Sequence, residues 1–166
     1  MTAAQSSFRD AMARLGAAVN IVTTDGVAGR HGITASSVCS VTDTPPTLLV
    51  CVNRASSANA VLKANGVLCV NVLAAHHAAL SKRFAGGAAS IADRFGDANE
   101  WRVVATGAPA LIDASVAIYC RIASVSEVGT HSVLFCEVAE VWMADEAAGL
   151  IWFDRDYYPL HSQAVA

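Results

Sequence analysis

Short apolar runs separated by turn signals recur along this chain, and their order limits the fold more than any other feature. Asp25-Gly26 ends the β-branched run at 17–24, and Gly129 follows the run at 116–125. Helical spacing is confined to a few short segments, without a regular alternation of strand and helix. The pattern of roughly six or seven strands and two or three helices predicts a mainly β, antiparallel barrel with attached helices rather than a parallel sheet.

The same pattern predicts where the individual elements lie. The expected strands are at 17–24, 33–41, 48–52, 67–73, 116–125, 133–143 and 150–153, and 109–112 is a candidate for one more short strand. The expected helices are at 8–15, 57–65 and 76–84, with a short helical piece around 91–95. The run at 48–52 is continuously apolar and is expected to be buried on both faces. Pro45-Pro46 is expected to stop regular structure, and Gly66 to end a helix. Residues 85–107 are the least regular, with Trp101 anchoring them, and the tail begins at Tyr157.

Composition narrows the class of protein. The chain has 166 residues, which predicts a single domain over 1–166. Its hydrophobic fraction of 54% suggests an oligomer with a buried interface. A net charge of −3 without a basic stripe argues against nucleic acid. No signal peptide or membrane-spanning run is evident, so a cytoplasmic protein without a membrane partner is expected. The five cysteines are unclustered, which predicts reduced thiols and no metal site.

Four polar features are candidates for binding or chemistry, and each has an ordinary structural alternative. The hydroxyl-rich run 32–41 could admit a ring or phosphate near the backbone, or it could be a polar edge strand. The junction 53–59 could hold an anion at a helix N-terminus, or its serines could merely cap the helix. His131 could contact a carboxamide from its turn, or be an incidental exposed residue. The aromatic stretch 152–158 could cover a planar ligand, or pack in the core or a dimer contact.

Familiar catalytic motifs are missing. There is no GxGxxG after a strand, no Walker motif and no GxSxG elbow, and no carboxylate pair lies in an apolar setting. His76 and His77 are expected to face different directions on a helix, which argues against joint metal binding. If the chain is an enzyme, its chemistry should therefore belong to a cofactor.

At residues 17–57 the chain resembles the short-chain flavin reductase family. Further resemblance lies at 8–12, 66–73, 80–86, 128–135 and 149–160, so that only about 87–107 departs from the pattern. The most similar branches are the reductase component of 4-hydroxyphenylacetate 3-monooxygenase and the flavin reductase of pyrimidine catabolism. The resemblance implies a split β-barrel of the FMN-binding type, a homodimer, and reduction of FMN or FAD by NADH for a separate monooxygenase. NADPH is possible, but the loops show no arginine cluster for its extra phosphate.

The resemblance also implies a set of site residues. His131 would lie near the nicotinamide and orient it, with Arg155 and Tyr158 bordering that pocket. The implied flavin-binding residues are Thr34, Ala35, Ser36, Ser37, Ser40, Val52, Asn53, Ser56, Ser57, Asn59, Val70, Asn71, Val72, Leu73, Ser81, Lys82, Arg83 and Phe84. Hydride transfer between two stacked rings needs no protein acid or base, which agrees with the missing dyads.

Three rival functions stay open at this point. The first is a flavin- or haem-binding protein of the same fold without turnover. The second is a flavoenzyme with another substrate, such as a pyridoxine phosphate, although residues 30–83 offer only Arg30, Arg54 and Arg83 for phosphate. The third is a structural subunit without a ligand, which the hydroxyl-rich run makes the weakest of the three.

Overall fold

The computed structural model describes residues 2–87, 90–103, 107–146 and 148–161. The helical segments are α1 (Ala3–Ala13), α2 (Ser57–Asn65), α3 (Ala78–Lys82), a π-helical turn (Arg83–Gly87), α4 (Ile91–Phe95) and a 3₁₀ turn (Ala98–Glu100). The strands are β1 (Ala17–Ala18), β2 (Asn20–Thr24), β3 (His31–Ala35), β4 (Val38–Asp43), β5 (Pro46–Asn53), β6 (Val67–Val72), β7 (Trp101–Val103), β8 (Pro109–Leu111), β9 (Val116–Val128), β10 (His131–Met143), β11 (Ala148–Phe153) and β12 (Asp156–His161).

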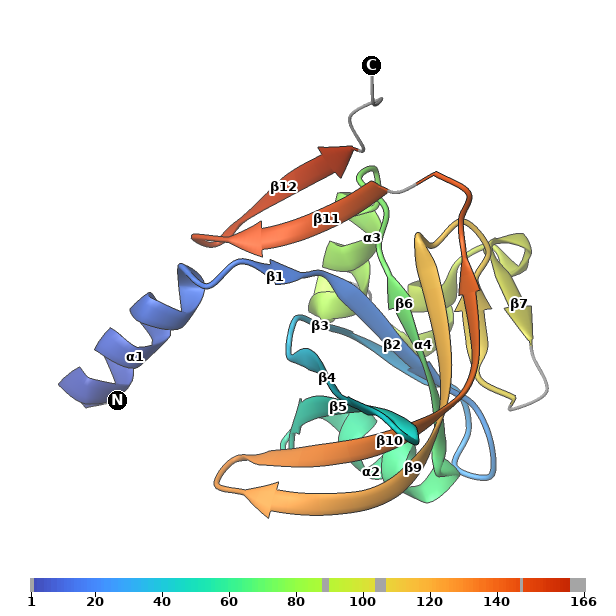
Figure 1. Cartoon of the computed structure of the whole chain (residues 1–166), viewed down its shortest axis with the longest axis horizontal. Helices are drawn as coiled ribbons and strands as arrows, with labels where there is room; N and C mark the ends of the chain where they lie inside the picture. The colour runs from blue at the N-terminus through green and yellow to red at the C-terminus, as the bar shows by residue number, and fades with distance from the viewer. Residues whose placement is uncertain (1, 88–89, 104–106, 147, 162–166) are drawn as a thin grey trace.

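The described strands form three antiparallel sheets (Figure 1). The largest runs in the order β3-β2-β6-β9-β10-β5-β4, and the smaller ones are β1-β11-β12 and β7-β8. The expectation of a mainly β chain with antiparallel pairing and attached helices is confirmed. Within the described residues, no helix is long and apolar enough to cross a membrane.

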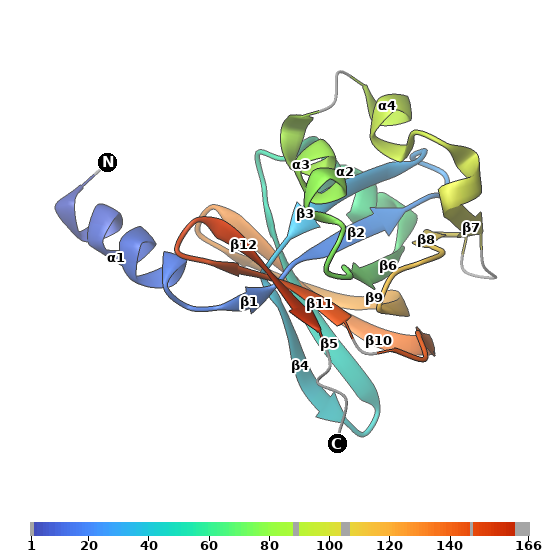
Figure 2. The ribbon, with the colours of Figure 1, turned by 90° about the horizontal axis from the view of Figure 1, so that it is seen from above.

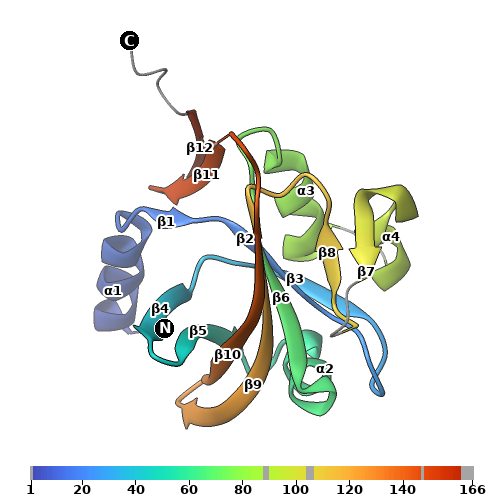
Figure 3. The same cartoon turned by 45° about the vertical axis from the view of Figure 1, so that its right-hand side comes forward.

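The apolar interior lies between the curved sheet and the helices. Figure 3 shows α2 near the lower end of the sheet and α3, α4 and β7 beside its other end. One cluster of buried side chains packs α2 against the sheet and includes Val50, Leu62 and Leu134. A second packs Phe84, Phe95 and Trp101 together under the helical segments. Trp101 Nε1 donates to the Phe95 carbonyl at 2.8 Å, so Trp101 does anchor this irregular part of the chain.

Several predicted elements were correct in kind but wrong in extent. The strand expected at 17–24 is divided at Val19, because β1 pairs with β11 while β2 pairs with β3 and β6. The helix expected at 76–84 is only α3, and the chain continues as the π-helical turn. The tail expected from Tyr157 is a strand, β12, paired with β11. Of the irregular segment, residues 88–89 and 104–106 lie outside the described residues.

The β4–β5 hairpin corrects two further expectations. Pro46 begins β5 instead of stopping it, since a proline without an N–H is tolerated at the first position of a strand. The Thr44–Pro45 peptide in the turn is cis. β5 is also buried on one face only: Leu48, Val50 and Val52 are buried, and the residues between them are partly exposed. Figure 2 shows this hairpin projecting away from α3 and α4.

Two local predictions were confirmed in detail. α2 begins and ends as expected, with Gly66 in the left-handed conformation at φ 67° after it. α4 spans Ile91–Phe95 as predicted.

The cysteines are free thiols, and burial raises the pKa of Cys120 and of Cys136 to about 12, so these two stay protonated at neutral pH.

Candidate functional site

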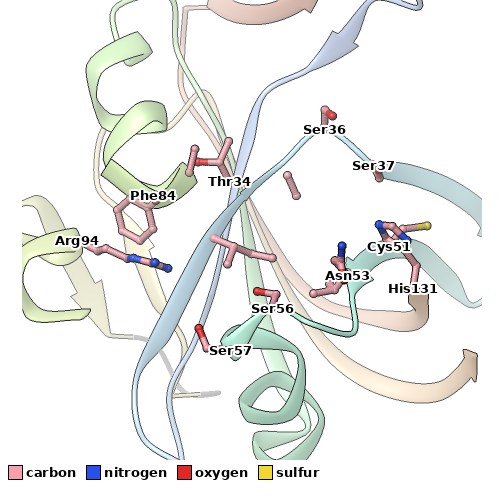
Figure 4. A pocket seen from close by; sticks show the side chains of 15 residues that line it. Thr34, Ser36, Ser37, Cys51, Asn53, Ser56, Ser57, Phe84, Arg94 and His131 are labelled. Carbon is pink, nitrogen blue, oxygen red and sulfur yellow. The ribbon is translucent and has the colours of Figure 1, made fainter. Parts of the chain in front are cut away.

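A cavity of about 360 Å³ opens where β3 and β4 separate. Figure 4 shows its lining side chains converging from β3, the starts of α2 and β10, the π-helical turn and α4. The lining residues are Ile33, Thr34, Ala35, Ser36, Ser37, Cys51, Val52, Asn53, Ser56, Ser57, Phe84, Ala85, Gly86, Arg94 and His131. This volume falls in the usual range for small-molecule sites.

The cavity depends on a break that the sequence did not reveal. The strand expected at 33–41 is two strands, because β3 pairs with β2 while β4 pairs with β5 on the opposite edge of the sheet. Ser36 and Ser37 form the break, and both are exposed. Ser37 is held in place by its carbonyl, which accepts from Cys51 N at 3.0 Å. The hydroxyl-rich run therefore supplies both edge strands of the large sheet, as the edge-strand alternative expected, and it also bends around an open space between them.

The start of α2 forms the floor of the cavity. Ser56 is the N-cap, and its Oγ accepts from the Ala58 N–H at 3.3 Å, so the capping alternative holds for this residue. Ser57, the first helical residue, lines the cavity without serving as that cap. Asn53 stabilises the turn between β5 and α2, because its Oδ1 accepts a hydrogen bond from Ala55 N at 2.9 Å. The positive end of the helix dipole thus faces the cavity beside the Ser57 hydroxyl, whose Oγ lies 3.0 Å from His31 Nε2.

Arg94 brings a full positive charge to the same cavity. It extends from α4, and its Nη1 donates to the Gly32 carbonyl at 2.8 Å. Its Nε is buried and has no hydrogen-bond partner among the described residues, which include no acidic partner for this arginine. Sequence reasoning missed Arg94 because it lies in the irregular segment that departs from the family pattern. A cation next to a helix N-terminus fits an anionic group, such as the phosphate of a flavin.

Gly32 permits the close contact between β3 and the aromatic cluster behind the cavity. A Cβ at this position would lie 2.6 Å from Cε1 of Phe84 and 3.4 Å from Cζ of Phe95. Phe84 lines the cavity, and its ring meets the Phe95 ring edge-on at a centroid distance of 5.2 Å. The glycine thus fixes how near β3 lies to both Phe84 and α4.

His131 lies on the rim of the cavity, where the β9–β10 turn ends. Gly129 takes the turn with φ 54°, and His131 pairs in register with Asn53 of β5. Its Nδ1 lies 2.9 Å from Thr130 Oγ1, and the side chain is otherwise exposed. The ring is therefore available to a ligand at this end of the β5–β10 pair.

A second cavity of about 280 Å³ adjoins the first and shares Thr34, Ser36 and Ala85 with it. Its other walls are Val19, Trp152 and Tyr157, and the two rings meet edge-on with centroids 4.8 Å apart. Two side chains of the aromatic stretch therefore line this second cavity and also pack against the core, and they differ from the two that the resemblance implied.

Ten of the residues implied by the resemblance line the first cavity: Thr34, Ala35, Ser36, Ser37, Val52, Asn53, Ser56, Ser57, Phe84 and His131. Their contact with a flavin or nicotinamide stays a prediction. The others lie outside it: Ser40, Asn59, Val70, Asn71, Val72, Leu73, Ser81, Lys82, Arg83, Arg155 and Tyr158.

Two of the polar residues outside the cavity, Asn59 and Asn71, form hydrogen bonds within the fold. Asn59 Nδ2 donates to the Val52 carbonyl and to Ser132 Oγ, and so ties α2 to β5 and β10. Asn71 is buried, with Nδ2 donating to Ile21 O and Oδ1 accepting from Leu111 N. These bonds satisfy buried amides that would otherwise cost free energy.

The residues of α3 and its continuation are also committed to partners within the protein. Ser81 is buried, and its Oγ lies 2.9 Å from the hydroxyl of Tyr157. Lys82 Nζ lies 5.7 Å from the centroid of the same ring. Arg83 forms an ion pair with Glu100 at 2.9 Å and faces a different hollow.

The last two implied residues lie on the β11–β12 hairpin, close along the chain to Tyr157 of the second cavity, but their side chains contact other partners. Arg155 is in the tight β11–β12 turn at φ 66° and pairs with Asp10 of α1. Tyr158 packs edge-on against Phe153, with ring centroids 6.0 Å apart.

The histidine pair corrects another expectation. His76 and His77 precede α3 and face the same partner, since their Nε2 atoms lie 3.1 and 3.2 Å from the two carboxylate oxygens of Asp113. His77 Nδ1 accepts from Ala74 N at 3.0 Å, which leaves the proton on Nε2, where it is donated to Asp113. The cluster thus fastens the segment before α3 to the turn after β8.

Comparison with known proteins identifies the family of this chain. Residues 12–161 match the model of the flavin reductase like domain. A protein of Cronobacter turicensis named FMN reductase (NADH) RutF is 58% identical over 94% of this chain and 93% of its own length. A protein of the same name from Variovorax paradoxus is 54% identical over 94% of this chain and 86% of its own.

Solved structures extend the likeness to the fold. BorF, the flavin reductase component of a bacterial two-component tryptophan halogenase, superposes with a TM-score of 0.88 at 25% identity, covering 96% of this chain and 99% of BorF. The Streptomyces globisporus NADH:FAD oxidoreductase SgcE6, solved with NAD and FAD fragments, gives 0.86 at 25% identity over 96% of this chain and 94% of its own. The chain that builds this cavity belongs to the flavin reductase like domain family.

Proposed function

We propose that this protein is a flavin reductase that transfers hydride from NADH to FMN. One observation carries the proposal: the cavity at the β3–β4 break combines small, polar walls at one end with an anion-binding end at Arg94 and α2. That combination suits a flat ring with a phosphate-bearing side chain. The names of the relatives, FMN reductase (NADH), support the same pair of substrates.

The flavin phosphate is assigned to the anion-binding end of the cavity. There the Arg94 guanidinium, the Ser57 hydroxyl and the positive end of α2 provide donors and charge of the right sign. This replaces the implied role of Ser81, Lys82 and Arg83, whose side chains are engaged elsewhere. FMN ends in a single phosphate that these groups can enclose, so FMN is preferred to FAD.

The ring of the flavin is assigned to the break between β3 and β4. The small side chains of Ser36 and Ser37 leave room for the ring at the break. Val52 and Asn53 of β5 also line this part of the cavity. The bound flavin supplies the redox chemistry, because it accepts a hydride from nicotinamide when the two rings are stacked about 3–3.5 Å apart. The protein's part is to position both rings and exclude water.

The nicotinamide is assigned to the side of the cavity that His131 borders, next to the hollow walled by Trp152 and Tyr157. A histidine there donates a hydrogen bond to the carboxamide and so orients the ring. This role is one of positioning, so loss of His131 should raise the KM for NADH more than the KM for flavin.

The assembly and cellular role complete the proposal. The chain acts as one domain over 1–166 whose large sheet closes into a split barrel, and it works as a cytoplasmic homodimer with the flavin near the interface. The exposed apolar side chains Phe8, Met12 and Leu15 support such an interface. Reduced flavin passes to a separate monooxygenase, as the two-component system of BorF suggests.

The deciding experiment follows NADH consumption with FMN, with FAD and with neither, in air and anaerobically. Oxidation that depends on added flavin, with bleaching of the flavin band when air is excluded, would establish the reductase and rank the two flavins. Flavin binding without NADH oxidation would instead indicate a carrier of the same fold. NADPH in place of NADH tests the nicotinamide preference in the same assay.

A further inference from the structure

We propose that His31 is a positioning residue that turns the Ser57 hydroxyl toward the phosphate of the flavin. The inference rests on the proposed function, because it deepens the role of the anion-binding end of the cavity. Neither the resemblance nor the cavity lining assigns anything to His31, which lies behind Ser57 as the first residue of β3.

The hydrogen bonds of His31 fix its tautomer. The side chain is only 5% exposed, and its Nδ1 accepts from the Gly32 N–H at 2.9 Å. A nitrogen that accepts carries no proton, so the proton of the neutral ring is on Nε2. Nε2 lies 3.0 Å from Ser57 Oγ, and it must be the donor in that contact.

The direction of this bond determines what Ser57 does. Because its oxygen accepts from His31, its own proton is free to be donated elsewhere, and Ser57 lines the cavity. Figure 4 shows the Ser57 and Ser56 side chains at the start of α2, on the same side of the cavity as Arg94. A hydroxyl that already accepts one hydrogen bond is also a stronger donor, since neighbouring bonds polarise one another.

The surroundings of His31 keep its ring neutral, and a neutral ring with its proton on Nε2 donates to the Ser57 oxygen. Burial lowers the pKa of His31, and the nearby positive charge of Arg94 lowers it further. His31 thus adds no charge of its own to the anion-binding end. It acts by orienting a donor, and so its effect should appear only with ligands that carry a phosphate.

The test compares FMN with riboflavin, which has the same ring and ribityl chain but no phosphate. His31→Gln keeps an N–H donor at the end of a side chain of similar size, whereas His31→Met fills the space without a donor. Dissociation constants for both flavins are measured by fluorescence quenching, in the wild-type protein and in a Ser57→Ala background. Thermal unfolding of each variant confirms that it is folded.

The expected result is a roughly fivefold loss of FMN affinity in His31→Met, the size of one neutral hydrogen bond. Riboflavin affinity should not change, His31→Gln should stay within about twofold of wild type, and His31→Met should have no further effect in the Ser57→Ala background. Equal losses for FMN and riboflavin, or a loss that persists without the Ser57 hydroxyl, would overturn the proposal. If the wild-type protein binds FMN no better than riboflavin, the phosphate assignment itself fails, whatever the variants show.

Discussion

The π-helical turn at 83–87 and the helix α4 each contribute an arginine, yet the two arginines face different surroundings. Arg83 pairs with Glu100 at 2.9 Å, so its charge is compensated inside the protein. Arg94 donates to a backbone carbonyl, lines the cavity, and has no acidic partner among the described residues. Arg83 and Arg94 carry the same charge, but only the charge of Arg94 lacks a counter-ion among the described residues. Arg94 is therefore the better candidate to bind an anionic ligand.

The largest expected effect is the loss of FMN affinity when Arg94 is removed. Arg94→Ala should weaken FMN binding roughly ten- to hundredfold, because a hydrogen-bonded charge contributes about 1.5–3 kcal/mol. Arg83→Ala is the matched control and should leave FMN affinity nearly unchanged. Equilibrium titration with FMN and with riboflavin checks both, and riboflavin should respond to neither variant. Equal losses in the two variants would remove the distinction between the arginines.

Gly32→Ala perturbs the contact that places α4 behind β3. The new Cβ would meet Phe84 at 2.6 Å, and the rings of Phe84 and Phe95 would have to move. We expect a loss of roughly 1–3 kcal/mol in the free energy of unfolding, as for other overpacked sites, with weaker FMN binding as Arg94 shifts. Gly149→Ala is the control, since its nearest neighbour would be 3.9 Å away. Urea unfolding measures both; similar stability in the two variants would contradict the tight contact.

The pH dependence of stability should also distinguish Arg94 from Arg83, because only Arg94 acts on the pKa of His31. The pKa of His31 is lowered from 6.5, first by burial and then by Arg94, so the unfolded chain takes up this proton before the folded protein does. Stability should therefore fall as the pH drops below about 6.5 and level off below the folded pKa. Arg94→Ala should make the decline smaller, and Arg83→Ala should not. Urea unfolding at about pH 7.5 and about pH 5.5 tests this; identical declines would show that Arg94 does not act on His31.

The smallest expected effect belongs to Glu100→Gln, which releases Arg83 from its partner. The pair is partly exposed, so its loss should cost less than about 1 kcal/mol of stability. FMN affinity should stay within about twofold of wild type, because Arg83 faces a different hollow. A clear gain in FMN affinity would mean that Arg83 can reach the phosphate after all, as the resemblance implied.

Local signals in the sequence predicted local structure well. Gly66 marked the end of α2, and the apolar spacing at 91–95 marked α4, because both depend on neighbours along the chain. The break at Ser36 was not predictable in this way. It arises because β3 and β4 pair on opposite edges of the sheet, and pairing between distant strands leaves no periodic trace in the run itself.

The sequence also could not show which polar side chains face the cavity. Ser57 and Asn59 are two residues apart and were both expected at the flavin, but Asn59 points back to Val52 and Ser132. Arg94 was missed for the opposite reason, because nothing in an irregular segment marks one arginine as facing inward. The resemblance predicted the part of the chain that forms the cavity, whereas the side chains that line it depend on the packing of distant segments.

Hydrogen exchange in the helix α1 should report whether the protein self-associates. None of its residues is buried, and its apolar side chains Phe8 and Met12 are 64% and 45% exposed. Figure 1 shows it extending away from the sheets, and it is attached through β1 and through the β11–β12 turn, whose Arg155 pairs with Asp10. A helix this short has little stability of its own in water, so its amides should exchange with solvent rapidly in a lone chain. Slow exchange in α1 that disappears on dilution would therefore report, residue by residue, how much of the protein is assembled.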